Sequence, residues 1–178
     1  MSKNLNLGCG NNIKKGWVNL DCTNLPGVDI VHDLNKLPLP FIDEEFECIR
    51  CDNILEHVEY LPLMEELHRI LKKGGVLRIR VPHFTSRNNF VDPTHKKCFS
   101  IDTFDFFVKN ITKNDYYFNF HFEHIRNKRI SFLKSGIYWN NRFIELIINM
   151  NSGVQRFYEN SFLCRIFPAN DVIVELIK

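Results

Sequence analysis

The sequence lacks any long apolar run, because no stretch approaches the roughly twenty residues that a membrane-spanning helix requires. The N-terminus also lacks the basic, then apolar, then small-residue order of a secretory signal peptide. These two absences predict a cytoplasmic protein without membrane association. With 178 residues, 44% of them hydrophobic, the chain has the size of one globular domain, and we expect residues 1–178 to form it.

An excess of either charge is missing as well. The chain has 23 Lys and Arg residues against 21 Asp and Glu residues, a formal net charge of +2. So small a charge does not create the field that a general nucleic-acid binder uses. We therefore expect a small-molecule partner, and no pattern in the sequence indicates an oligomeric state.

The six cysteines show neither a disulfide framework nor a zinc-finger pattern. Cys48 and Cys51 form a CxxC pair, but they lie in an apolar run that looks like a strand, where residues three apart point to opposite faces. His121 and His124 have helical ligand spacing, yet the phenylalanines around them alternate as on a strand. We expect Cys48 and Cys51 to be buried thiols, and we expect no metal site.

The most informative stretch is LNLGCG, residues 5–10. Gly8 and Gly10 interrupt an apolar run, and glycine lets the chain turn sharply and lets a ligand approach the main chain. Asp21 ends the next apolar run, where a carboxylate can bond the hydroxyls of a ribose. The pattern predicts a nucleotide-type cofactor site, although such glycines also mark ordinary turns.

The order of the remaining elements predicts an α/β fold. Only ten residues separate Gly10 from Asp21, so the first crossover must be abbreviated. Repeated strand, crossover, strand order favours a mainly parallel sheet covered by helices. The predicted strands span residues 4–8, 17–21, 28–33, 46–52, 76–81, 116–125 and 171–177, with 128–133 as a further arm if 116–125 opens a hairpin. The predicted helices span 61–72 with a glycine end at 72–75, then 100–108, 137–150 and 154–158.

Five motifs in this order resemble the class I S-adenosylmethionine-dependent methyltransferases, of the small stand-alone type 11 kind. The resemblance covers roughly the first hundred residues and is far more specific than the glycines alone. It implies a Rossmann-like fold: a mainly parallel seven-stranded sheet, one antiparallel C-terminal strand beside strand five, and helices on both faces. It also implies S-adenosylmethionine as cofactor. The motifs are LNLGCGNN, VNLD, VHDL, DNILEHV and LHRILKKGGVLRIRVP.

The resemblance also implies roles for individual residues. The first motif would wrap the methionine part of the cofactor, the acid ending strand two would hold the ribose, the third motif would contact the adenine, and the loop after strand four would pass beneath the sulfonium. Asn12 departs from the family pattern, because it stands at the usual third glycine position. The cofactor-binding residues so implied are Gly8, Cys9, Gly10, Asp21, Asp33, Leu34, Asp52, Asn53 and His57.

The polar stretch over residues 83–99 is long for a loop in a compact domain, which favours a binding segment. It follows strand five, beside the expected methyl donor, so we interpret it as the acceptor side. His95 is our first choice for a general base, with Asp92 orienting it, and His83 is the second. Glu56 and His57 lie near this side too, where they either serve the site or only cap the next helix.

These residues favour a methyltransferase that acts by direct displacement on a small molecule or a sugar or glycan precursor, with O-methylation preferred. Asp52 and Asn53 are followed by Ile54 and Leu55, without the two prolines and the aromatic residue expected of enzymes that methylate DNA amino groups. Two alternatives stay open. One is a non-catalytic cofactor-binding or scaffold protein on the same fold, and the other is a dinucleotide-dependent oxidoreductase, which Asp21 alone would permit.

Overall fold

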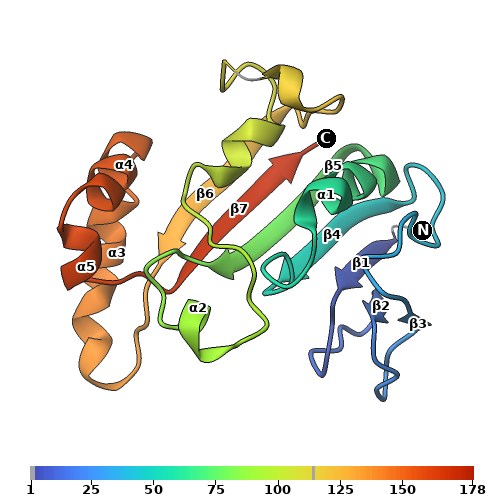
Figure 1. Cartoon of the computed structure of the whole chain (residues 1–178), viewed down its shortest axis with the longest axis horizontal. Helices are drawn as coiled ribbons and strands as arrows, with labels where there is room; N and C mark the ends of the chain where they lie inside the picture. The colour runs from blue at the N-terminus through green and yellow to red at the C-terminus, as the bar shows by residue number, and fades with distance from the viewer. Residues whose placement is uncertain (1–2, 114) are drawn as a thin grey trace.

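The computed structural model describes residues 3–113 and 115–178. Its strands form one sheet in the order β3-β2-β1-β4-β5-β7-β6 (Figure 1). Strand β7 runs antiparallel to both of its neighbours, and the other neighbouring pairs are parallel. The predicted Rossmann-like sheet with an antiparallel C-terminal strand beside strand five is confirmed. The strands are β1 (Asn4–Leu7), β2 (Val18–Asp21), β3 (Ile30–Val31), β4 (Phe46–Asp52), β5 (Leu71–Pro82), β6 (His124–Ser131) and β7 (Asp171–Ile177).

The helices gather toward the C-terminal half of the sheet. Helix α1 crosses in front of β4 and β5, while α3, α4 and α5 group beyond β6, at the opposite end of the sheet from β1–β3 (Figure 1). Among the described residues, no helix is long and apolar enough to cross a bilayer. The helices are α1 (Tyr60–Ile70), α2 (Asn88–Val91), α3 (Asn141–Ile148), α4 (Ser152–Asn160) and α5 (Leu163–Ile166), with 3-10 turns η1 (Thr103–Phe107), η2 (Asp115–Tyr117) and η3 (Gly136–Asn140).

The first three crossovers are short. Within the described part of the chain, no helix stands between β1 and β2, between β2 and β3, or between β3 and β4. The abbreviated first crossover is therefore confirmed, and the shortening extends further than predicted. One face of the sheet consequently keeps charged side chains in contact with solvent: Arg50, Arg78 and Arg80 are 33%, 45% and 43% exposed. The helices are thus less evenly shared between the two faces than expected.

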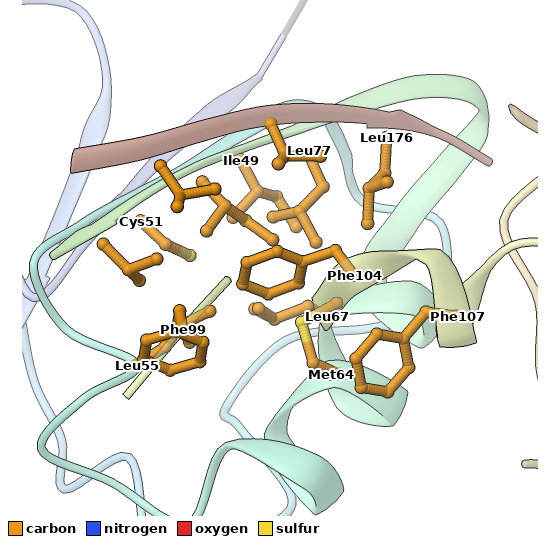
Figure 2. Packing of buried hydrophobic residues seen from close by; sticks show 14 of the residues in the cluster. Ile49, Cys51, Leu55, Met64, Leu67, Leu77, Phe99, Phe104, Phe107 and Leu176 are labelled. Atoms are coloured by element: carbon orange, nitrogen blue, oxygen red, sulfur yellow. The ribbon is translucent and has the colours of Figure 1, made fainter. Parts of the chain in front are cut away.

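The hydrophobic core lies on the other face. Ile49, Leu77 and Leu176, from β4, β5 and β7, point toward Met64 and Leu67 of α1, and Phe104 of η1 fills the space between (Figure 2). All six side chains are fully buried. The period of two along each strand produces this layer, because alternate residues of β5 face the core and the solvent.

The strand expected over residues 28–33 is only Ile30–Val31, and the helix expected over 100–108 is a 3-10 turn over Thr103–Phe107. Two further segments differ in kind from the sequence prediction. Residues 72–75 belong to β5 and not to a helix end, because the C-terminus pairs with them: Gly74 N–H donates to Lys178 O at 2.5 Å, and Lys178 N–H to Gly75 O at 3.1 Å. Strand β6 begins only at His124, so most of residues 116–125 is not a strand. There the alternating phenylalanines pack against η1, with Phe107 and Phe118 centroids 4.7 Å apart.

Candidate functional site

The turn after β1 is built around Gly8. Its φ is +60°, and a Cβ there would lie 2.1 Å from Ile54 Cδ1. Only glycine combines that backbone angle with so close an approach. The first motif therefore packs directly against the segment that follows β4, which places these two motifs side by side at the carboxyl edge of the sheet.

Asp21 ties the same turn together. The residue is 91% buried, Oδ2 accepts a hydrogen bond from Gly10 N–H at 2.8 Å, and Oδ1 accepts one from Thr23 N–H at 2.9 Å. Gly10 has a φ of +47° and no heavy atom within 4 Å of the position of a Cβ, so open space adjoins the turn. We call Gly8, Gly10 and Asp21 the cradle. Each Asp21 oxygen keeps a lone pair for a ribose hydroxyl, so the cradle fits a nucleoside-type cofactor.

The other residues expected at the cofactor have different surroundings. Cys9 is buried, its N–H bonds Leu20 O at 3.0 Å, and burial raises the pKa of its thiol. Leu34 belongs to the hydrophobic core. The main-chain N–H of Asn35 bonds Asp33 and lowers the pKa of that carboxyl. Asp52 forms an ion pair with Arg50 at 2.5 Å.

A cleft of about 240 Å³ opens at the carboxyl ends of β4 and β5. The loop that follows β5 closes one side of it, where Lys96 N–H donates to Glu56 O at 2.8 Å. A larger hollow of about 650 Å³, lined by Asp43, Glu44 and His68 among others, adjoins the amino ends of β4 and β5, away from the cradle. The smaller cleft is the candidate acceptor site, and its lining is Asn53, Glu56, His57, Pro82, Asn88, Val91, Asp92 and His95.

Glu56 is the most unusual group in this cleft. Its side chain is fully buried, and neither carboxylate oxygen has a hydrogen-bond partner among the described residues. Burial raises the pKa of this carboxyl to about 7. A buried acid without a partner costs folding free energy, so its presence needs an explanation outside stability.

His57 is held by a chain of hydrogen bonds from the loop. The Thr94 hydroxyl donates to Asp92 Oδ1 at 2.6 Å, so it accepts from His57 Nδ1–H at 2.8 Å. This arrangement leaves Nε2 of the neutral ring with a free lone pair. Burial, and then the neighbouring His95 ring, lower the pKa of His57. We call Glu56, His57 and His95 the Glu–His cluster.

His95 and His83 occupy different environments. The His95 ring lies 4.6 Å from that of His57, centroid to centroid, and its Nε2 is 3.8 Å from Asp92 Oδ2, beyond hydrogen-bond distance. His83 is fully buried, with its two ring nitrogens 2.7 Å from Thr85 Oγ1 and 2.9 Å from Glu159 Oε1. It does not line the cleft, so we do not carry it forward as a base.

Sequence reasoning weighed Glu56 only as an undecided neighbour of His57, and it gave Thr94 no role. The signal for Glu56 was its place in a loop at the carboxyl edge of the sheet. The role of Thr94 depends on a contact across 37 residues, which no local pattern reports.

Part of the sequence is similar to known proteins. Residues 9–79 match the family described as a methyltransferase domain. An uncharacterized protein of Methanocaldococcus jannaschii is 38% identical over a match that covers 47% of this chain and 40% of that protein, so the chain spans less than half of this relative.

Solved structures share the fold across almost the whole chain. A SAM-dependent methyltransferase from Archaeoglobus fulgidus aligns with a TM-score of 0.60 at 20% identity, over 99% of this chain and 86% of that one. A Haloferax volcanii putative methyltransferase, solved with the Trm112 methyltransferase activator, aligns with a TM-score of 0.59 at 15% identity, over 99% of this chain and 82% of that one. The sequence of residues 9–79 thus matches a methyltransferase domain, and the fold over almost the whole chain is that of solved SAM-dependent methyltransferases.

Proposed function

We propose that this protein transfers a methyl group to a hydroxyl of a small-molecule acceptor, of the size of a sugar or a glycan precursor. The observation that carries the proposal is the contact between the two parts of the site: Gly8 of the cradle packs on Ile54, and Asn53 and His57 on either side of Ile54 line the cleft. An acceptor in the cleft therefore lies beside the cofactor site.

Different residues would bind the cofactor and align the acceptor. The cradle and Asn53 would hold the cofactor, with Asp21 at the ribose and Asp33 and Leu34 toward the adenine. Bound S-adenosylmethionine supplies an electrophilic methyl carbon. The protein then has to align the acceptor oxygen and exclude water, and alignment of this kind can contribute on the order of 7 to 11 kcal/mol to the barrier.

A hydroxyl acceptor must also lose its proton. His95, buried to 93% at its side chain, is our candidate for the base, and Asp92 adds negative charge nearby. A positioned base contributes on the order of a hundred- to ten-thousand-fold in rate. The size of the cleft, about 240 Å³, suits part of a small molecule better than a macromolecular surface.

The test combines a binding and a turnover measurement. Candidate acceptors are screened for release of S-adenosylhomocysteine, and His95→Ala is then compared with the wild type. We expect unchanged affinity for S-adenosylhomocysteine by calorimetry and a loss of transfer of at least about a hundredfold. Unchanged turnover would remove His95 from the mechanism. Cofactor binding with no acceptor turned over in a broad screen would favour a non-catalytic role.

A further inference from the structure

We propose that the Glu–His cluster is a binding site for a divalent first-row transition-metal ion, with Zn²⁺ as the best match. One ligand atom each from Glu56, His57 and His95 lie within 4.8 Å of one another. Around a tetrahedral ion at about 2.1 Å, ligand atoms stand about 3.4 Å apart, so small side-chain rotations bring these three to bonding distance. Sequence reasoning had expected no metal site.

The first support is the state of the buried donors. Glu56 is completely buried with both oxygens unpaired, and His95 Nδ1 is also buried without a partner among the described residues. Two orphaned polar groups within one cluster of residues are costly in a folded protein. A cation bound between them would satisfy both at once.

The second support is the hydrogen bonding that fixes the orientation and tautomer of the His57 ring. Its Nδ1–H is bonded to Thr94, whose hydroxyl is in turn bonded to Asp92, so Nε2 carries the free lone pair. A histidine that binds a metal through one nitrogen commonly has the other fixed in this way by a hydrogen-bond partner. The chain from Asp92 to Thr94 to His57 reproduces that arrangement with residues of this protein alone.

The third support is the setting of the cluster. Two histidines and a carboxylate are a donor set that suits Zn²⁺ and related ions, and three protein ligands leave a coordination position for water or substrate. The cleft provides that opening, with Asn53 and Pro82 on its wall. When ionised, the carboxylates of Asp92 and Glu56 add negative charge that favours a bound cation.

The ion would deepen the proposed function, and this part rests on it. An acceptor hydroxyl bound at the open position would lose its proton to water more readily, because the ion stabilises the alkoxide. The two histidine lone pairs would then serve as ligands, and in the metal-bound protein His95 would promote loss of the acceptor proton through the ion and not as a free base. Ion binding itself does not depend on any methyl transfer.

The test is a titration of tag-free, EDTA-treated protein with Co²⁺, followed by visible absorption, and with Zn²⁺ in competition. The exposed Cys22 and Cys98 are replaced by serine in every variant, so that surface thiols do not bind the ion. We expect one ion per chain. Glu56→Gln, His57→Ala and His95→Ala should each weaken binding at least about a hundredfold, and Thr94→Val about tenfold.

His124→Ala is the matched control, because His124 is an exposed histidine at the start of β6, outside the cleft. Its affinity for Co²⁺ should equal that of the parent. Glu56→Gln preserves shape, and its thermal melt verifies folding. Absence of stoichiometric binding, or equal binding by the Glu56→Gln and His124→Ala variants, would overturn the metal site. Calorimetry with S-adenosylhomocysteine on the same proteins tests the cofactor site separately.

Discussion

The cradle and the Glu–His cluster each contain a buried carboxylate, and the two carboxylates are in opposite states. Asp21 accepts two main-chain hydrogen bonds, whereas Glu56 accepts none among the described residues. The fold therefore completes the cradle by itself, because main-chain donors hold the acid where a ribose would need it. The cluster is left incomplete at a cost in stability, which is expected of a site that a ligand completes.

The largest expected effect comes from filling the cradle. Gly8→Ala places a Cβ against Ile54 and also forces a left-handed φ on alanine. We expect lost affinity for S-adenosylhomocysteine and a fall in the free energy of unfolding well beyond the 1–2 kcal/mol or so of the backbone angle alone. Calorimetry and urea unfolding measure the two.

Gly16→Ala is the matched control for this change. Its φ is +79°, and nothing lies within 4 Å of a Cβ there, so it carries the backbone strain without the clash. Adding Ile54→Ala to Gly8→Ala should restore part of the lost stability. Equal destabilisation by Gly8→Ala and Gly16→Ala would show that close packing does not shape the cradle.

The next effect is a pH dependence that belongs to the cluster. With metal chelated, the pKa of Glu56 is about 7 in the folded protein against an ordinary 4.5. Above pH 4.5 the unfolded chain loses the proton first, so stability is lost as pH rises from about 4.5 to 7. The difference corresponds to at most about 3 kcal/mol. Glu56→Gln should therefore leave stability unchanged at pH 4 and raise it at pH 8, measured by urea unfolding.

Glu66 should show the opposite pH dependence of stability, and it is the comparison for Glu56. It is also buried, but it accepts hydrogen bonds from Arg69 and from Leu39 N–H, and the Arg69 bond lowers its pKa. Its contribution is present above its ordinary pKa and lost as the pH falls. Glu66→Gln should destabilise the protein near neutral pH. If the two variants shift stability in the same direction at pH 8, the contrast between satisfied and unsatisfied carboxylates is wrong.

A smaller effect is expected on cofactor affinity from Asp21→Asn. The amide keeps one acceptor but turns an NH₂ toward a main-chain N–H, so one of the two charged hydrogen bonds is lost. Such a bond contributes about 1.5–3 kcal/mol, which predicts a roughly 10- to 100-fold weaker binding of S-adenosylhomocysteine. Asp29→Asn is the control: Asp29 accepts Asn19 N–H at 2.7 Å, outside the cradle, and cofactor affinity should persist.

The smallest effect is expected at the adenine side. The carboxylate of Asp33 accepts hydrogen bonds only from Asn35 among the described residues and is partly accessible to solvent, so Asp33→Asn removes little of the arrangement. We expect a loss of cofactor affinity below about tenfold by calorimetry. A larger loss than that of Asp21→Asn would mean that the adenine contact, and not the ribose contact, dominates binding.

Much of the cofactor half could be predicted from the sequence. Strands β4 and β7 match the predicted spans, and the Gly8–Gly10 turn and Asp21 meet as expected, because each depends on local backbone preferences and on the alternation of apolar residues. The helical prediction at residues 72–75 was wrong since its true partner, Lys178, lies about a hundred positions further along the chain.

The acceptor half shows the limit of this reasoning. The sequence paired Asp92 with His95, but in the structure the Asp92 carboxylate accepts from the Thr94 hydroxyl, and Thr94 contacts His57. The structure also removes His83 from the cleft by bonding it to Glu159. The contacts of Thr94 with His57 and of His83 with Glu159 join residues far apart in the chain, and spacing within a loop does not report them.

The sequence by itself determined the Rossmann-like fold and the meeting of Asp21 with the glycine turn after β1, because glycine conformation and strand periodicity act within a few residues. Only the tertiary structure decided that Glu56 is buried without a partner among residues 3–113 and 115–178, and that the loop after β5 brings His95 beside His57 and orients the His57 ring through Thr94. Burial and hydrogen bonding depend on which distant segments meet, and that is a property of the packed chain.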